Sequence, residues 1–181
     1  MCDSCGCGDP SKVSVEVHDK ILSANDRTAA HNREHFVEGG VFVVNLMGSP
    51  GAGKTAVLEA TARALADKGR IGVIAGDLET ERDADRLRAV GVPAAAITTG
   101  SACHLDAEMV HKSLHHFPWR ELDYLFVENV GNLVCPAIYD LGQAVNVVAL
   151  SVTEGEDKPL KYPVMFRKAD LVLLTKVDLL P

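Results

Sequence analysis

The fold is decided by the stretch Gly48-Ser49-Pro50-Gly51-Ala52-Gly53-Lys54-Thr55, which matches the phosphate-loop pattern G-x-x-x-x-G-K-S/T at every position. The stretch follows an apolar run at 41–47 and precedes a segment of helical spacing at 56–68, as a true phosphate loop does. Its glycines let backbone N–H groups point inward around a phosphate chain, and the helix N-terminus adds positive potential. We expect Lys54 to reach the β and γ phosphates and the Thr55 hydroxyl to hold Mg²⁺. The residues expected to bind the nucleotide here are Gly48, Ser49, Gly51, Ala52, Gly53, Lys54, Thr55 and Ala56.

Outward from this loop, apolar runs alternate with segments of helical spacing. Continuous apolar runs of this length are typical of strands that are buried on both faces. Their alternation with helices predicts a doubly wound, mostly parallel α/β sheet. The strands are expected at 41–47, 71–75, 94–98, 124–127, 145–152 and 171–175, and the helices at 13–36, 56–68, 84–90 and 105–117.

Charge and composition argue against several classes of function. The chain of 181 residues holds 18 basic and 25 acidic side chains, a net charge of -7, whereas a nucleic-acid-binding domain presents a basic face. No run of about 18 apolar residues could cross a membrane, and the N-terminus lacks the basic and apolar regions of a secretory signal. We therefore expect a cytoplasmic protein without nucleic-acid or membrane partners, whose thiols stay reduced.

Residues 1–10 form a cysteine- and glycine-rich head, which precedes a helix and connector at 11–40 and the main domain at 41–181. Cys2, Cys5 and Cys7 offer three thiolates beside the N-terminal amine. Three sulfurs and one nitrogen suit the nearly planar coordination that Ni²⁺ or Cu²⁺ accepts and that structural Zn²⁺ does not prefer. The residues of the head therefore predict a site for Ni²⁺ or Cu²⁺. A redox-active Cys-x-x-Cys pair is the alternative, although no thioredoxin-like context surrounds it.

A second nucleotide-binding feature follows the last apolar run. The string Thr175-Lys176-Val177-Asp178 is similar to the N/T-K-x-D motif with which GTPases read the base. A buried Asp178 carboxylate would accept hydrogen bonds from the guanine ring N–H and amino group, and adenine would leave it unpaired. Lys176 and Asp178 are thus expected to select guanine. A polar strand end without this function is the alternative.

Beyond these two motifs, the sequence contains longer strings that are more specific than the phosphate loop. They are the head Cys2-x-x-Cys5-Gly6-Cys7, Gly76-Asp77, Asp83-Ala84, Cys103-His104-Leu105-Asp106-Ala107, ENVGNLVCP at 128–136 and SVTEGEDKPLKYP at 151–163. Together they resemble the hydrogenase nickel-incorporation GTPases of the HypB family, and the resemblance covers almost the whole chain. It implies a P-loop NTPase of the SIMIBI type. That family usually continues past the base-reading motif, so we expect this chain to be C-terminally short relative to the family.

The resemblance implies roles for four residues around the phosphates. Asp77 and Asp83 would lie in the first switch region and approach Mg²⁺, although a solvated helix face is the alternative for Asp83. Glu128 would take the place of the Walker-B acid and orient a Mg²⁺-bound water. Gly131 would be the switch glycine whose N–H meets the γ-phosphate. The expected catalytic set, Lys54 with Asp77, Glu128 and Gly131, would act slowly, by positioning and charge stabilisation without an arginine finger.

An internal metal site is expected from Cys103, His104 and Cys135. Both cysteines lie in loops that follow strands, so the three residues can converge on one edge of the sheet. Two or three such ligands suit Ni²⁺ or Zn²⁺ and leave a coordination position open, whereas simple burial is the alternative for a cysteine in an apolar loop. The resemblance places this site at a homodimer interface beside the switch of Glu128. Nucleotide state and metal affinity would then be linked reciprocally.

The function that the motifs and the resemblance imply is GTP-dependent delivery of nickel during the maturation of nickel–iron hydrogenases. GTP or GDP, Mg²⁺ and Ni²⁺ are the expected cofactors, with Zn²⁺ as an alternative at the internal site. The expected partners are a second copy of the chain and a maturation protein that accepts or relays nickel. The string Lys158–Lys161 would lie at the dimer interface near the nucleotide, with a solvated charged loop as its alternative.

Three other functions remain open. They are a non-catalytic nickel-binding or storage protein, a urease-type nickel-insertion GTPase, and an ATP-using P-loop kinase or ATPase. Asp178 and the lack of an acceptor-binding lid disfavour the last, and the cysteine-rich head favours the hydrogenase branch over the urease branch. The six histidines other than His104 are expected on solvent-facing helical surfaces and are assigned no role.

Overall fold

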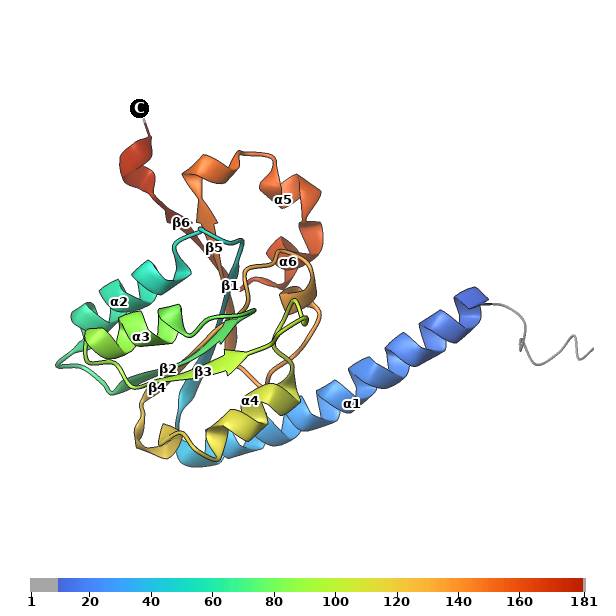
Figure 1. Ribbon diagram of the computed structural model, residues 1–181, viewed down its shortest axis with the longest axis horizontal. Coiled ribbons are helices and arrows are strands. Elements are labelled where there is room, and N and C mark those ends of the chain that lie inside the picture. The colour runs from blue at the N-terminus through green and yellow to red at the C-terminus, as the bar shows by residue number, and fades with distance from the viewer. Residues whose placement is uncertain (1–9, 181) are drawn as a thin grey trace, which may run out of the picture.

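The computed structural model describes residues 10–180, so Cys2, Cys5 and Cys7 of the predicted metal-binding head lie outside the described residues. The centre of the domain is a six-stranded sheet with the order β3-β2-β4-β1-β5-β6 (Figure 1). Every neighbouring pair of strands is parallel, which confirms the predicted class of sheet. The strands are β1 (Phe42–Gly48), β2 (Ile71–Asp77), β3 (Ala94–Thr98), β4 (Tyr124–Glu128), β5 (Val145–Ser151) and β6 (Leu171–Thr175).

Helices cover both faces of the sheet, as a doubly wound fold requires. They are α1 (Pro10–Gly39), α2 (Lys54–Leu65), α3 (Arg82–Ala89), α4 (Ala107–Leu114), α5 (Lys158–Lys161) and α6 (Pro163–Lys168), with 3-10 turns η1 (Trp119–Glu121), η2 (Cys135–Ala137), η3 (Val152–Glu154) and η4 (Val177–Leu179). Leu58 of α2 and Leu87 of α3 pack in the core on one face. Phe36 of α1 and Val110 of α4 pack in the core on the other face. Burial of both faces explains why the strands read as continuous apolar runs.

The observed elements agree with the expected ones to within a few residues. The bounds of β3 and β6 are as predicted, whereas the helix expected at 105–117 is shorter and begins at Ala107. The Asp106 side chain caps that helix by accepting a hydrogen bond from the Met109 N–H. The short helices α5 and α6 were not expected, because four and six residues are too few for a helical period to be visible.

The longest helix, α1, is fastened to the domain by two buried asparagines. The Asn25 side chain donates to the Asp140 carbonyl at 2.8 Å and accepts from the Ala107 N–H at 2.9 Å. The Asn32 side chain donates to the carbonyls of Ala107, at 2.9 Å, and Leu141, at 3.2 Å. These bonds hold α1 alongside α4 (Figure 1). Neither α1 nor any other helix within residues 10–180 combines the length and apolar character needed to cross a membrane.

The carboxyl ends of the strands meet at one edge of the sheet, which is where ligands bind in open α/β sheets. β1 ends at Gly48, where the phosphate loop begins, and β2 ends at Asp77. β4 ends at Glu128, which lies beside Leu46 of β1 in the register of the sheet. β6 ends at Thr175, the first residue of the predicted base-reading motif. The fold therefore brings both nucleotide motifs and the predicted switch residues to the same edge.

Candidate nucleotide and metal sites

The phosphate loop connects β1 to α2 and owes its shape to two glycines. Gly51 and Gly53 have φ angles of 75° and 90°, which residues with a side chain rarely adopt. Lys54 begins α2, and its Nζ lies 3.4 Å from the Gly48 carbonyl and 3.3 Å from the Ser49 carbonyl. Burial lowers the pKa of Lys54, although nearby carboxylates oppose the shift. The ammonium is thus held at the mouth of its own loop, where a phosphate would replace the two carbonyls as its partner.

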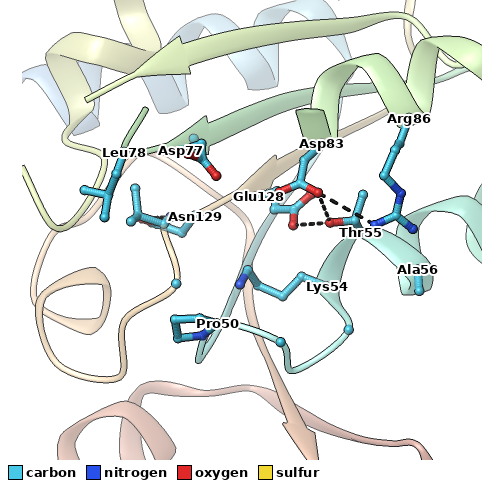
Figure 2. A pocket seen from close by; sticks show the side chains of 15 residues that line it. Pro50, Lys54, Thr55, Ala56, Asp77, Leu78, Asp83, Arg86, Glu128 and Asn129 are labelled. Carbon is cyan, nitrogen blue, oxygen red and sulfur yellow. Dashed lines mark hydrogen bonds and ion pairs between the residues drawn. The ribbon is translucent and has the colours of Figure 1, made fainter. Parts of the chain in front are cut away.

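A cleft of about 400 Å³ opens beside this loop (Figure 2). Three carboxylates, one ammonium and one guanidinium line it, a set that matches a phosphate chain accompanied by a divalent cation. The walls come from the ends of β2 and β4 and from the starts of α2 and α3. The lining residues are Pro50, Gly51, Gly53, Lys54, Thr55, Ala56, Gly76, Asp77, Leu78, Asp83, Arg86, Glu128, Asn129, Val130 and Gly131.

The Thr55 hydroxyl lies between two carboxylates of the cleft. It is 2.8 Å from Asp83 Oδ1 and 2.9 Å from Glu128 Oε1, as the dashed lines of Figure 2 mark. Glu128 is only 3% exposed, and its Oε2 has no hydrogen-bond partner within the described part of the chain. Burial, followed by the charge of Asp83, raises the pKa of Glu128 to about 7. A buried carboxylate with a spare oxygen is electrostatically unsatisfied unless a cation approaches it.

This set of oxygens fits Mg²⁺. Magnesium is usually held by one or two carboxylates together with substrate phosphates and water, rather than by a closed cage of protein ligands. The Thr55 hydroxyl and the Glu128 and Asp83 carboxylates gather around one point. Asp83, for which a solvated helix face was the alternative, is therefore directed toward the phosphate loop.

Asp77 and Gly131 lie on the side of the cleft away from α2. Asp77 Oδ1 accepts hydrogen bonds from the backbone N–H groups of Glu79, at 3.0 Å, and Thr80, at 3.1 Å. Burial acts to raise the pKa of Asp77, but these hydrogen bonds outweigh it and hold the pKa below its ordinary value. A Cβ added to Gly131 would lie 2.8 Å from the Pro50 side chain, so only glycine lets this segment approach the phosphate loop so closely.

The base-reading motif lies beyond the end of β6, outside the cleft lined by the phosphate loop. Thr175 Oγ1 donates to the Ala52 carbonyl at 2.6 Å, and Lys176 adopts a left-handed φ of 55° that turns the chain into η4. The expectation that the Asp178 carboxylate is buried is wrong, because Asp178 is exposed. β6 is an edge strand, and the turn that follows it, η4, has exposed side chains at Val177, Asp178 and Leu179.

The predicted internal metal ligands converge, as their loop positions suggested. The Sγ atoms of Cys103 and Cys135 are 3.0 Å apart, and Cys103 Sγ lies 3.7 Å from His104 Nδ1. All three ligand atoms lie within 4.8 Å of one another, and each residue is half-buried. The His104 ring stacks on Tyr139 at a centroid distance of 3.8 Å, and burial lowers the pKa of His104. Two sulfurs and a nitrogen that is neutral at ordinary pH make a partial coordination shell for Ni²⁺ or Zn²⁺.

Sequence reasoning missed Asn129, which connects the cleft to the metal ligands. Asn129 is buried and lines the cleft directly after Glu128. Its Oδ1 accepts from the N–H of Leu105, at 3.1 Å, and of Val130, at 3.0 Å, and its Nδ2 donates to Asn45 Oδ1 at 3.2 Å. Leu105 directly follows Cys103 and His104 in the chain. A single amide therefore holds together the switch segment and the loop that carries two metal ligands.

Arg86 of α3 was also missed. It lines the cleft, with Nη2 2.9 Å from Glu59 Oε1 and Nη1 3.8 Å from Asp83 Oδ1. A cation supplied by the same chain could stabilise charge on the phosphates, as an arginine finger does. Arg86 belongs to no recognisable motif, and its position one turn after Asp83 is the signal that could have identified it.

Comparisons with known proteins agree with this geometry. The family described as "CobW/HypB/UreG, nucleotide-binding domain" matches residues 42–181. The chain is 55% identical over 167 residues to the hydrogenase maturation factor HypB of Azotobacter vinelandii, a match that covers 92% of this chain and 55% of that protein. It therefore spans about half the length of this curated relative.

Solved structures show the same relationship. HypB from Helicobacter pylori, crystallised in complex with nickel, matches with a TM-score of 0.80 and 50% identity over 86% of this chain and 73% of that chain. The signal recognition particle 54 kDa protein from Aeropyrum pernix matches with a TM-score of 0.59 and 15% identity over 76% of this chain and 36% of that chain, and so shares the fold alone. The expected P-loop fold of the SIMIBI type is confirmed. This chain belongs to the CobW/HypB/UreG family of P-loop nucleotide-binding proteins, within its HypB branch.

Proposed function

We propose that this chain is a GTP-hydrolysing metallochaperone that supplies Ni²⁺ during the maturation of nickel–iron hydrogenases. One observation carries the proposal: Asn129 bonds the switch segment of the nucleotide cleft to the segment that bears Cys103 and His104. A nucleotide cleft that is hydrogen-bonded to a segment with cysteine and histidine ligands suits a protein in which hydrolysis controls the release of a metal ion. The names of two relatives, a hydrogenase maturation factor and a HypB crystallised with nickel, support this reading.

In hydrolysis, the chain's own residues would position the phosphates and offset their charge. Lys54 would exchange the carbonyls of its loop for the β and γ phosphates. Thr55, Glu128 and Asp83 would hold Mg²⁺, with Asp77 nearby in the first switch region. Mg²⁺ supplies neutralisation of the charge that develops on the transferring phosphoryl group.

The base would be read by the motif at the end of β6. Asp178 would accept two hydrogen bonds from guanine, and adenine cannot supply them in the same arrangement. Because Thr175 bonds to Ala52, the base-reading turn keeps a fixed position relative to the phosphate loop. The exposure of Asp178 weakens its discrimination in the free chain, since water satisfies an exposed carboxylate whichever base is present.

Nickel would be the cargo of the Cys103, His104 and Cys135 cluster. Three ligands leave at least one coordination position to be filled. A second copy of the chain could fill it, and the exposed apolar side chains of Val134 and Ile138, 47% and 40% exposed, flank η2 where that copy would pack. We therefore propose that two copies of the chain form a homodimer and share the metal site. A maturation partner would then take the ion when the dimer opens.

Hydrolysis and metal transfer can be tested together. The release of phosphate from GTP is measured with Mg²⁺ for the unchanged chain, for Lys54→Ala, and for Lys68→Ala, which changes an exposed lysine in the turn after α2. We expect Lys54→Ala to reduce turnover by about 10²-fold or more and Lys68→Ala to leave it unchanged. Transfer of Ni²⁺ to a coloured chelator should be faster with hydrolysable GTP than with a non-hydrolysable analogue.

Other outcomes would select the alternative functions. If phosphate release is the same in Lys54→Ala and in the unchanged chain while Ni²⁺ still binds, the chain is a non-catalytic nickel-binding or storage protein. Equal displacement of a fluorescent GDP by unlabelled GDP and ADP would favour an ATP-using protein. The urease-type alternative would be favoured by nickel transfer to urease proteins and not to hydrogenase proteins.

A further inference from the structure

Four histidines gather along the seam between α1 and α4. His31 and His35 are one turn apart on α1, and His111 and His115 are one turn apart at the end of α4. The expectation that these side chains all face solvent is wrong for His35 and His111, which are half-buried where the two helices meet. The sequence hides this arrangement because the two pairs are about 80 residues apart in the chain.

The nitrogen atoms of the first pair already have a spacing suited to metal binding. His31 Nε2 and His35 Nε2 are 3.0 Å apart. Two imidazoles that share one ion through bonds of about 2.0–2.1 Å hold their nitrogens about 2.9–3.4 Å apart, depending on the bond angle. Residues one helical turn apart point to the same side of a helix, which is why such a pair can chelate.

The ring positions bring a third imidazole close to the first pair, and a fourth lies next to the third. Rings that share an ion have centroids about 4.5 Å apart when the bond angle at the ion is about 90° and about 6.4 Å apart when they lie on opposite sides of it. The centroids of His31 and His35 are 4.3 Å apart, close to the lower value. The His111 centroid lies 5.3 Å from that of His31 and 6.1 Å from that of His35. His115 lies 5.1 Å from His111. The nitrogens of three of these histidines do not all lie within 4.8 Å of one another in the described part of the chain. The His111 side chain must therefore turn for its Nε2 to reach the ion held by the first pair.

The hydrogen bonds of Asn32 prepare His111 for this role. Both donations from the Asn32 amide go to backbone carbonyls, so its Oδ1 faces His111 as an acceptor, 2.9 Å from Nδ1. His111 must therefore carry its proton on Nδ1, which leaves the Nε2 lone pair free. Metal-bound histidines usually donate their other ring N–H to a fixed acceptor in this way. Asn32 is fully buried, so the acceptor that selects this tautomer of His111 keeps its place.

We propose that His31, His35 and His111, with His115 as a fourth ligand, form a metal site distinct from the cysteine cluster and selective for divalent cations that prefer nitrogen, such as Ni²⁺ and Zn²⁺. Imidazole suits these ions, whereas Mg²⁺ demands oxygen. The site joins α1 to α4, and α4 begins three residues after His104. An ion bound there would fasten α1 across the segment that leads to the cysteine cluster. This inference does not depend on GTP hydrolysis or on hydrogenase maturation.

The test uses the full chain with its five cysteines replaced by serine, so that no thiolate competes. Binding of Ni²⁺ and of Zn²⁺ is measured by titration calorimetry with excess Mg²⁺ present, and circular dichroism verifies folding. We expect one ion per chain and no nickel–thiolate absorption. His31→Gln, at an exposed position, and His35→Gln, at a half-buried one, should each weaken binding by at least about tenfold. His116→Gln, an exposed histidine next to His115, is the matched control and should bind as the background does.

A second measurement separates a shared site from loose surface binding. Zn²⁺ that links two helices stabilises the folded state, so it should raise the melting temperature of the background chain and of His116→Gln. It should leave the melting temperature of His35→Gln nearly unchanged. The proposal is overturned if the folded background chain binds neither ion, if His31→Gln and His35→Gln bind as tightly as the control, or if Zn²⁺ stabilises all variants equally.

Discussion

Thr175 Oγ1 donates a 2.6 Å hydrogen bond to the carbonyl of Ala52, which ties the end of β6 to the phosphate loop. The two residues are 123 positions apart in the chain. Ala52 is fully buried between Gly51 and Gly53, two glycines with positive φ, so the bond reaches the buried centre of the phosphate loop. The phosphate-binding and base-reading ends of the nucleotide site are thereby built as one unit.

Removing this bond should weaken nucleotide binding. Thr175→Val keeps the shape of the side chain but loses the hydroxyl, at a cost of about 1 kcal/mol, or roughly fivefold in GDP affinity. Thr175→Ser retains the hydroxyl and should bind GDP almost as the unchanged chain does. The affinities are measured by titration of a fluorescent GDP. Equal affinity in the valine and serine variants would show that the bond does not organise the site.

Base selectivity should depend on Asp178. Asp178→Asn replaces one acceptor oxygen with an N–H₂ donor, which suits the C2 carbonyl of xanthine better than the amino group of guanine. We expect GDP to compete less well and xanthosine diphosphate to compete better, so that their order of affinity reverses. Competition against a fluorescent nucleotide measures both. Asp170→Asn, a carboxyl at the opposite end of β6, is the control and should keep the original order.

The stability of the nucleotide-free protein should depend on pH through Glu128. Its pKa rises from an ordinary 4.5 to about 7 on folding. Between these values the unfolded carboxyl is ionised while the folded one keeps its proton, so the free energy of unfolding falls as pH rises from about 4.5 to about 7. The loss from this group is at most about 3 kcal/mol, and no further loss from it follows at higher pH.

Glu128→Gln should remove that part of the pH dependence, and denaturant unfolding in the presence of EDTA measures it. Glu79→Gln changes an exposed carboxyl of the neighbouring loop and serves as the control. If Glu128→Gln and the unchanged chain lose stability equally over this pH range, the carboxyl is ionised in the folded protein. Mg²⁺ and GDP together should also reduce the dependence in the unchanged chain, since a cation satisfies the ionised carboxylate.

Coupling between nucleotide and nickel should run through Asn129. Typical coupling energies of 1–3 kcal/mol change the affinity for GDP by about 5- to 150-fold when the second ligand binds. Asn129→Ala removes the acceptor of the Leu105 N–H and should bring the ratio of GDP affinities with and without Ni²⁺ close to one. Asn129→Asp keeps an acceptor oxygen and should retain most of the ratio. If both variants keep the coupling, it does not run through Asn129.

Nickel binding at the internal site should require both cysteines. In a chain whose Cys2, Cys5 and Cys7 are replaced by serine, Cys135→Ser should weaken Ni²⁺ binding by at least about tenfold and diminish the thiolate-to-nickel absorption. The physical reason is that Cys103 Sγ and Cys135 Sγ are already adjacent and supply the two soft ligands. Ser101→Ala, an exposed change in the same loop as Cys103, is the control. An unchanged affinity in Cys135→Ser would place the ion elsewhere.

The amino-acid sequence by itself determined the parallel sheet and the phosphate loop. These features depend on residues that are close together in the sequence. A Gly-rich loop between an apolar run and a helix has few alternative structures, because its glycines and its lysine act on the backbone and on atoms of the same loop. The convergence of Cys103, His104 and Cys135 also followed, since loops after parallel strands meet at one edge. The ends of the helices were less visible, because a helix end depends on one or two residues. The short helices α5 and α6 were also less visible, because they contain too few residues to show a helical period.

Only the tertiary structure decided how distant residues meet. The bond from Thr175 to Ala52, the bridge made by Asn129 and the histidine cluster between α1 and α4 each join segments from different parts of the chain. The sequence states what each of these residues is but not which residues it contacts, because the contacts depend on strand order and on how each helix lies across the sheet. The burial of Glu128 and the exposure of Asp178 were settled in the same way, because burial is a property of what packs around a residue and not of the residue itself.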